Sequence, residues 1–127
     1  MYSESNLFRK AYKYAMRSYD QVAILSAKYG LLLPDEEIEP YELTLKNRGK
    51  DKRLEWSKKA LHQMEQKIGL DRIRGVFFHA GKEYRQFLRP MLKQSRISCE
   101  VPLEGLSIGR QLAWYNKREA EEFRDAC

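Results

Sequence analysis

The feature that most constrains the fold is the segment of residues 26–49, which cannot form one regular element. Gly30, Pro34, Pro40 and Gly49 interrupt it, and neither glycine nor proline is well tolerated inside a long helix or a central strand. Stretches of this length without regular structure are uncommon in small domains, where they are usually functional. The sequence therefore predicts a functional loop between two regular elements, held in shape by contacts.

Helices and short strands are predicted on both sides of this loop. Apolar residues at helical spacing predict helices at residues 5–19, at 50–68, from Gly81 onward with a break or kink at Pro90, and at 109–126. Short apolar runs predict strands at residues 21–25, 73–80 and 97–101. Strands that alternate with helices imply parallel pairing with helices on both faces. We expect a single three-layer α/β domain over residues 1–127, with a short, mainly parallel sheet.

Composition narrows the classes of protein to which the chain can belong. Its 127 residues suit one domain. No apolar run approaches the roughly 20 residues that a membrane span needs, and the first residues have no signal-peptide core. Cys99 and Cys127 are too few for a disulfide framework and have no metal-site spacing. We expect a cytoplasmic protein with no metal, no cofactor and no membrane contact.

Charge is unevenly distributed along the chain. The formal net charge is +6 and the sequence pI is about 9.3. Basic residues gather at 9–17 and 46–59, whereas acidic residues gather at 35–42 and 119–125. Basic clusters of this kind can contact phosphates, and a solvated basic surface is the alternative interpretation. The segregation of charge favours an oriented partner such as a nucleic acid or a nucleotide-like ligand.

Three loops follow the predicted strands and are candidates for a ligand cleft, because ligands collect at the carboxyl ends of parallel strands. These loops cover residues 26–45, 79–84 and 102–114. Lys28 can hold a phosphate with the help of Ser26, although Ser26 can also cap a turn while Lys28 stays solvated. Tyr84 can stack on a base or pack in the core, and Gly109 can open a helix whose amides bind an anion. The predicted ligand-binding residues are Ser26, Lys28, Tyr29, Gly30, Tyr41, Gly81, Tyr84, Gly109 and Gln111.

Two titratable residues are candidates for acid–base chemistry. His79 ends a predicted strand, where a side chain can face a ligand, and Glu104 lies in the third loop. A lone histidine is also often a core or rim residue, which is the interpretation for His62 in mid-helix. No phosphate-binding loop, dinucleotide motif, nucleophile elbow or metal constellation is present. Whether the protein is an enzyme stays open at this point.

The loop also carries a recognisable motif. The stretch LSAKYGLLLPDEEIEPYELTL resembles the LSxxYGxLxPxxxxxPYxLxx motif of the YaaA family of the bacterial peroxide stress response. Small uncharacterised relatives of that family in bacteria and phages are similar here and at FFHAGKEYRQFLRPML and VPLEGLSIGRQLAW. The resemblance implies a YaaA-like α/β core that binds DNA in a positively charged cleft. The positions that match these motifs are Ser26, Tyr29, Gly30, Pro34, Pro40, Tyr41, Gly81, Tyr84, Pro102, Gly105, Gly109 and Gln111.

The resemblance departs from the family at its beginning. Relatives start with an additional strand and a lysine-containing loop, whereas this chain opens at MYSESNLF on the first helix. We therefore expect the usual first strand to be missing, which would leave a sheet edge that a homodimer can cover.

Three functional hypotheses follow from the sequence. The first is DNA or nucleotide binding in the cleft of the three loops. The second is an enzyme that acts on a nucleotide, nucleoside or modified base, with His79 or Glu104 as the acid–base group. The third is a phage or bacterial interaction factor that binds a protein through the acidic loop 35–42.

Overall fold

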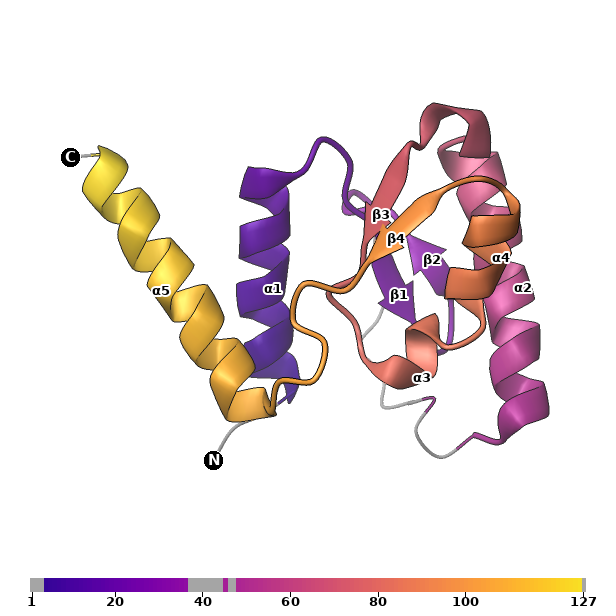
Figure 1. The fold of residues 1–127 in the computed structure, drawn as a ribbon. Helices are drawn as coiled ribbons and strands as arrows, with labels where there is room; N and C mark the ends of the chain where they lie inside the picture. The colour runs from indigo at the N-terminus through magenta and orange to yellow at the C-terminus, as the bar shows by residue number, and fades with distance from the viewer. Residues whose placement is uncertain (1–3, 37–44, 46–47, 127) are drawn as a thin grey trace. The chain divides into compact units, whose positions relative to one another are not determined.

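The computed structural model describes residues 4–36, 45 and 48–126 and shows a small α/β fold, with helices and short strands alternating along the chain (Figure 1). Contacts divide the chain into two compact units, one of Met1–Val22 with Leu103–Cys127 and one of Ala23–Pro102, and each is described by itself. The prediction of a single domain with three layers stays a prediction. In chain order the elements are α1 (Glu4–Ser18), β1 (Ile24–Ser26), β2 (Gly30–Leu32), α2 (Lys50–Lys67), the 3₁₀ helix η2 (Leu70–Arg72), β3 (Gly75–Phe77), α3 (Lys82–Arg85), α4 (Leu88–Gln94), β4 (Ser98–Glu100) and α5 (Ile108–Ala126).

The strands of the 23–102 unit form two pairs of opposite type. β3 and β4 are parallel, with Val76 opposite Cys99, as the intervening helices predict. β1 and β2 form an antiparallel hairpin, with Leu25 opposite Leu31. The sequence prediction missed β2 and was therefore wrong about parallel pairing for the first strand. The reason is that Gly30, with φ of 85°, closes a three-residue turn instead of beginning an irregular loop.

The helices lie close to where the periodicity places them, with one informative difference. The predicted break in the third helix falls at Gln86 and Phe87, between α3 and α4, and not at Pro90. Pro90 is the third residue of α4, where a backbone N–H would have no partner within the helix. Proline is therefore tolerated at this position, and the chain breaks one turn earlier.

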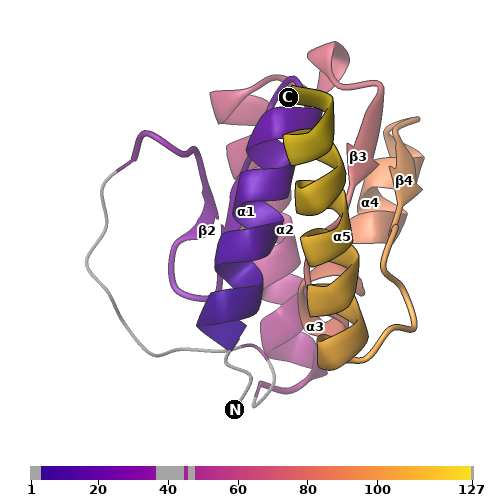
Figure 2. The ribbon, with the colours of Figure 1, turned by 90° about the vertical axis from the view of Figure 1, so that its left-hand side faces the viewer.

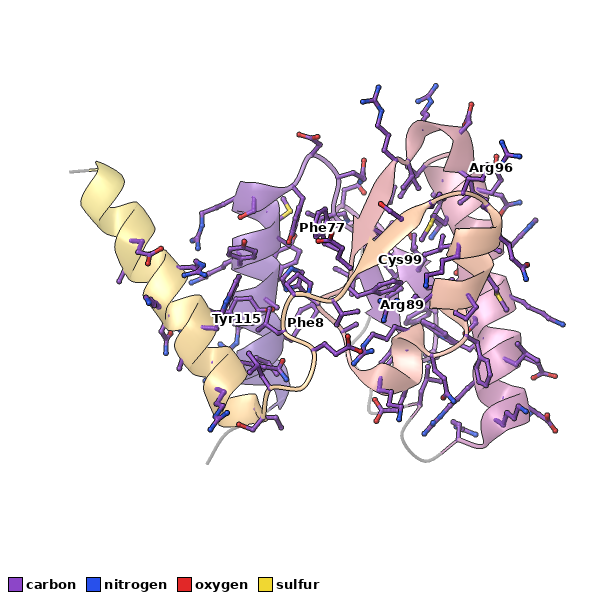
Figure 3. All side chains as sticks on the ribbon, in the orientation of Figure 1. Phe8, Phe77, Arg89, Arg96, Cys99 and Tyr115 are labelled. Atoms are coloured by element: carbon purple, nitrogen blue, oxygen red, sulfur yellow. The ribbon has the colours of Figure 1, made fainter. Side chains whose placement is uncertain are left out.

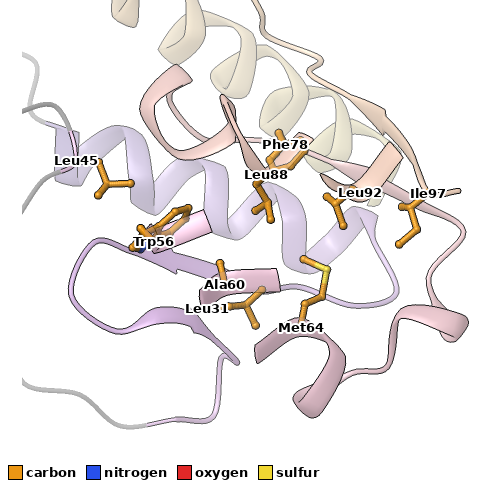
Figure 4. Close-up of a cluster of buried hydrophobic side chains, with 9 residues drawn as sticks. All are labelled: Leu31, Leu45, Trp56, Ala60, Met64, Phe78, Leu88, Leu92 and Ile97. Atoms are coloured by element: carbon orange, nitrogen blue, oxygen red, sulfur yellow. The ribbon is translucent and has the colours of Figure 1, made fainter. Parts of the chain in front are cut away.

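The core of the 23–102 unit is built around α2 (Figure 4). Trp56, Ala60 and Met64 follow one another at four-residue spacing and are all buried, which places them on one side of the helix. They pack with the hairpin, with α4 and with the residues that flank β3 and β4. The other buried members of this cluster are Leu31, Leu45, Phe78, Leu88, Leu92 and Ile97.

The other unit consists of α1 and α5, which pack side by side and run in the same direction (Figure 2). Its buried residues are Ala11, Leu103 and Tyr115. Tyr14 contacts both Trp114 and Tyr115, with ring centroids 4.9 Å and 5.8 Å apart. Aromatic packing thus joins the two helices, and Trp114 belongs to this packing rather than to an open stacking surface.

Replacing Gly30 by alanine should destabilise the protein by about 1–3 kcal/mol, the usual cost of a strained backbone position. Gly30 has a left-handed backbone, and a Cβ atom there would overlap Oε1 of Gln63. Urea unfolding measures the loss. Gly49→Ala is the matched control, because an added Cβ at Gly49 meets nothing within 4 Å.

A double-mutant cycle separates the two causes of this cost. In the Gln63→Ala background the overlap is gone and only the backbone strain remains. Gly30→Ala should therefore cost less in that background than in the wild type. Equal costs in both backgrounds would show that the Gln63 side chain moves aside without penalty.

Candidate functional site

The turn between β1 and β2 is fixed by side-chain hydrogen bonds. Ser26 is only 6% exposed, and its Oγ accepts a bond from the backbone N–H of Tyr29 at 3.1 Å. From α2, Gln63 donates through Nε2 to the carbonyl of Tyr29 at 2.9 Å and accepts through Oε1 from the N–H of Leu31 at 2.7 Å. Ser26 and Gly30 thus have structural roles here, because one closes the turn and the other leaves room for Gln63.

A second group of α2 side chains links this turn to the segment after β3. The indole N–H of Trp56 donates to the carbonyl of Ser26 at 2.8 Å, and the same ring meets Tyr84 edge-on at a centroid distance of 5.4 Å. Arg53 donates to the carbonyl of Leu45 at 3.0 Å and to Oε1 of Gln86 at 3.4 Å. The structure therefore brings two of the three predicted loops together, and α2 lies between them.

Two lysines carry the positive charge of the turn. Lys28 is exposed, and its ammonium lies 5.2 Å from the ring centroid of Tyr29. Lys59 reaches the turn from α2, where its ammonium donates to the carbonyl of Lys28 at 3.3 Å. We define the turn site as residues 26–31 together with Trp56, Lys59 and Gln63 of α2.

An ion pair lies beside the turn site. The ammonium of Lys67 is 2.8 Å from a carboxylate oxygen of Glu36 and also donates to the carbonyl of Leu31 at 2.8 Å. The hydrogen bond from Lys67, together with one from the N–H of Leu33, lowers the pKa of Glu36 below its usual value. Glu36 is therefore charged at neutral pH, and Lys67 offsets its charge.

His79 and Gly81 lie at the carboxyl end of β3. His79 is half-buried, and burial lowers the pKa of its imidazole below the usual value of 6.5. It is therefore mainly neutral at pH 7 and has the protonation state of a general base. Gly81 precedes the first residue of α3, and its carbonyl accepts from the N–H of Tyr84 at 3.0 Å. Tyr84 packs against Trp56, which favours the packing interpretation over base stacking.

The third predicted loop belongs mostly to the other unit, so its convergence with the first two stays a prediction. Glu104 is exposed. α5 begins at Ile108, one residue before Gly109, and Oγ of Ser107 accepts from the N–H of Arg110 at 3.3 Å, which satisfies one terminal amide. Gln111 donates to the carbonyl of Leu106 at 2.9 Å and holds the preceding turn.

Some of the predicted residues lie outside the described part of the chain. Tyr41, Pro40 and most of the acidic loop 35–42 lie outside the part of the chain that the structure describes. Within that part, no group of three or more His, Cys, Asp or Glu side chains is placed to hold a metal ion. No helix in the same residues has the length and apolar character of a membrane span.

Replacing His79 by glutamine should flatten the dependence of stability on pH. Because the folded-state pKa of His79 lies below 6.5, the unfolded chain binds a proton first as the pH falls. The wild type should lose stability below about pH 6.5, by no more than roughly 1.4 kcal/mol per pH unit from one proton. Urea unfolding between pH 7.5 and 5.5 measures this slope.

The matched control is His62→Gln, since His62 is exposed on α2. It should keep the wild-type slope. A His79→Gln variant with an unchanged slope would show that His79 is not the group responsible.

Comparison with curated proteins and with solved structures finds no significant match. A family model does match, and it covers residues 1–117, which include the 23–102 unit with the whole turn site and most of the other unit. The model is that of DUF6884, described as a family of unknown function. The chain therefore belongs to the DUF6884 family.

Proposed function

We propose that this protein binds a nucleic acid or a nucleotide-like ligand through phosphate contacts at the turn site. The observation that carries the proposal is a pair of ammonium groups at the turn, one from the turn itself and one from α2. Lys28 is exposed at the turn itself, and Lys59 binds the backbone of the same residue. Two cations held by one turn form a ready contact for a phosphate.

The rigidity of the turn supports a binding role. Four hydrogen bonds between the side chains of Ser26, Trp56 and Gln63 and the backbone fix residues 26–31. A preorganised loop binds with a smaller entropic cost than a loop that must become ordered on binding. The turn therefore presents Lys28 and Tyr29 in a defined place before any ligand arrives.

The electrostatics of the surroundings also support an anionic ligand. The chain carries a net charge of +6, and the carboxylate of Glu36 is paired with Lys67. This pairing reduces the repulsion that Glu36 would exert on a phosphate at the turn. The resemblance of the loop to the YaaA motif points independently to the same class of ligand.

An enzyme that acts on a nucleotide, nucleoside or modified base is the second candidate, and His79 favours it. A half-buried imidazole at the carboxyl end of a parallel strand, neutral at pH 7, suits a general base. The test is incubation of the protein with nucleotides and nucleosides, followed by mass spectrometry of the products. A product formed by the wild type and not by a folded His79→Gln variant supports catalysis. Equal amounts of product from both would show that His79 is not the general base.

Reversing the charge of Lys28 should weaken binding of oligonucleotides by about tenfold or more, or ~1.4 kcal/mol. Fluorescence anisotropy with a labelled oligonucleotide between 50 and 200 mM KCl measures the affinity and its salt dependence. The wild-type affinity should fall steeply with salt, and Lys28→Glu should make the fall less steep by about one unit in a double-logarithmic plot.

Lys58→Glu is the control, because Lys58 is exposed on α2. This substitution changes the net charge by the same amount as Lys28→Glu. Its helical position is roughly 100° or more from those of Lys59, Gln63 and Trp56. Equal losses in the two variants would indicate a general charge effect and would contradict the turn site. Affinity without salt dependence, or no binding at all, would contradict the proposed function.

A further inference from the structure

Helix α1 has a surface that the packing against α5 does not use. Leu7, Ala11 and Tyr14 make the contacts with the Leu103 and Tyr115 cluster. These three residues recur at spacings of four and three, which places them on one side of the helix. The residues on the remaining sides of α1 therefore do not contribute to the core of this unit.

A row of cations lies on one of these sides. Arg9, Lys13 and Arg17 are spaced four residues apart, and all three are exposed. Successive members of such a row are about 6 Å apart along the helix axis. Lys10 differs from them, because it is only half-exposed and lies 3.7 Å from a carboxylate oxygen of Glu119 on α5.

The row has very little acidic charge on its own helix. Glu4, the first residue of α1, is the helix's single acidic residue. Arg9 and Lys13 are like charges four residues apart, so they repel one another and weaken the helix slightly. An anionic ligand that binds along the row would remove this repulsion.

Exposed aromatic surface borders the Arg9 end of this row, because Tyr12 follows Arg9 by three residues on the helix. Phe8 is 49% exposed, and its ring stacks on that of Tyr12, with centroids 6.0 Å apart and planes at 19°. Figure 3 shows Phe8 on the side of α1 away from Tyr115. A nearly parallel aromatic pair beside cations is the combination used to bind single-stranded nucleic acids, where phosphates meet the cations and bases stack on the rings.

We propose that this surface of α1, formed by Phe8, Arg9, Tyr12, Lys13 and Arg17, is a second contact for nucleic acid and prefers single strands. The class of ligand rests on the proposed function, but this surface shares no residue with the turn site. The cations neutralise successive phosphates, and the Phe8–Tyr12 pair receives an unpaired base. The flat, stacked rings favour a base over an acyl chain as their partner.

The first test compares two triple variants with the same net charge. The first variant carries glutamine at Arg9, Lys13 and Arg17. The control variant carries glutamine at Lys10, Lys117 and Arg118. Anisotropy with a labelled oligothymidylate should show a loss of about tenfold or more at 50 mM KCl for the first variant. Its salt slope should fall by about two units, since each phosphate contact on a single strand contributes roughly 0.7.

The control variant should lose less affinity and keep most of the slope. Circular dichroism verifies that both variants keep the helix content of the wild type. Equal losses in the two triple variants, or wild-type affinity in the first, would overturn the proposal.

The second test isolates stacking. Phe8→Leu keeps an apolar side chain but removes the ring, so it should weaken binding of oligothymidylate several-fold, since one stacked base contributes roughly 1–3 kcal/mol. It should leave the affinity for an abasic strand of the same length unchanged. An equal loss on both strands would overturn the role of stacking.

The same measurements separate this inference from the proposed function. If the α1 triple variant binds like the wild type and Lys28→Glu binds more weakly, the result supports the turn site and contradicts the α1 contact. If the α1 triple variant binds more weakly and Lys28→Glu binds like the wild type, the result supports the α1 contact and contradicts the turn site. Binding of wild type to phosphatidylglycerol vesicles that an excess of oligothymidylate does not displace would assign the surface to a membrane and overturn the inference.

Discussion

The amide side chain of Gln63 is the contact on which the architecture of the 23–102 unit depends most. It donates to the carbonyl of Tyr29 and accepts from the N–H of Leu31, and so it binds the backbone on both sides of Gly30. A glutamine amide satisfies one donor and one acceptor at once, which otherwise requires another strand. α2 therefore acts as the polar partner of a hairpin that would be marginal on its own.

α2 also supplies hydrogen-bond donors to buried backbone carbonyls elsewhere in this unit. Ser26, Leu31 and Leu45 are buried, and each buried carbonyl without a partner costs roughly 1–3 kcal/mol. Trp56 and Lys67 supply donors to the carbonyls of Ser26 and Leu31, while Arg53 supplies one to Leu45. Apolar packing by Ala60 and Met64 occupies the neighbouring positions. One helix thus provides both the hydrophobic core and the hydrogen bonds that shape the loop.

Much of this fold is predictable from local patterns, but its central contacts are not. Apolar periodicity places α1, α2 and α5 within a residue or two, because a helix buries one side and repeats every 3.6 residues. Gly30 has a positive φ, a backbone conformation that glycine adopts without steric cost. The sequence pattern does not predict the β1–β2 hairpin, although Gly30 follows a three-residue turn, because it assigns Gly30 to a long loop. No local pattern connects Gln63 with residues more than thirty positions earlier, and nothing in the sequence distinguishes it from the other polar residues of α2.

The structure also separates two kinds of residue within the motif that carries the family resemblance. Ser26 and Gly30 close the turn and admit Gln63, so their replacement would change the shape of the loop whatever its ligand. Lys28 is exposed at that turn, and its ammonium lies over the ring of Tyr29. A motif dominated by residues of the first kind specifies a loop geometry more strongly than a reaction. The side chains of Ser26 and Gln63 and the backbone of Gly30 therefore set the geometry of the turn, whereas the ligand contact proposed above falls on the exposed Lys28.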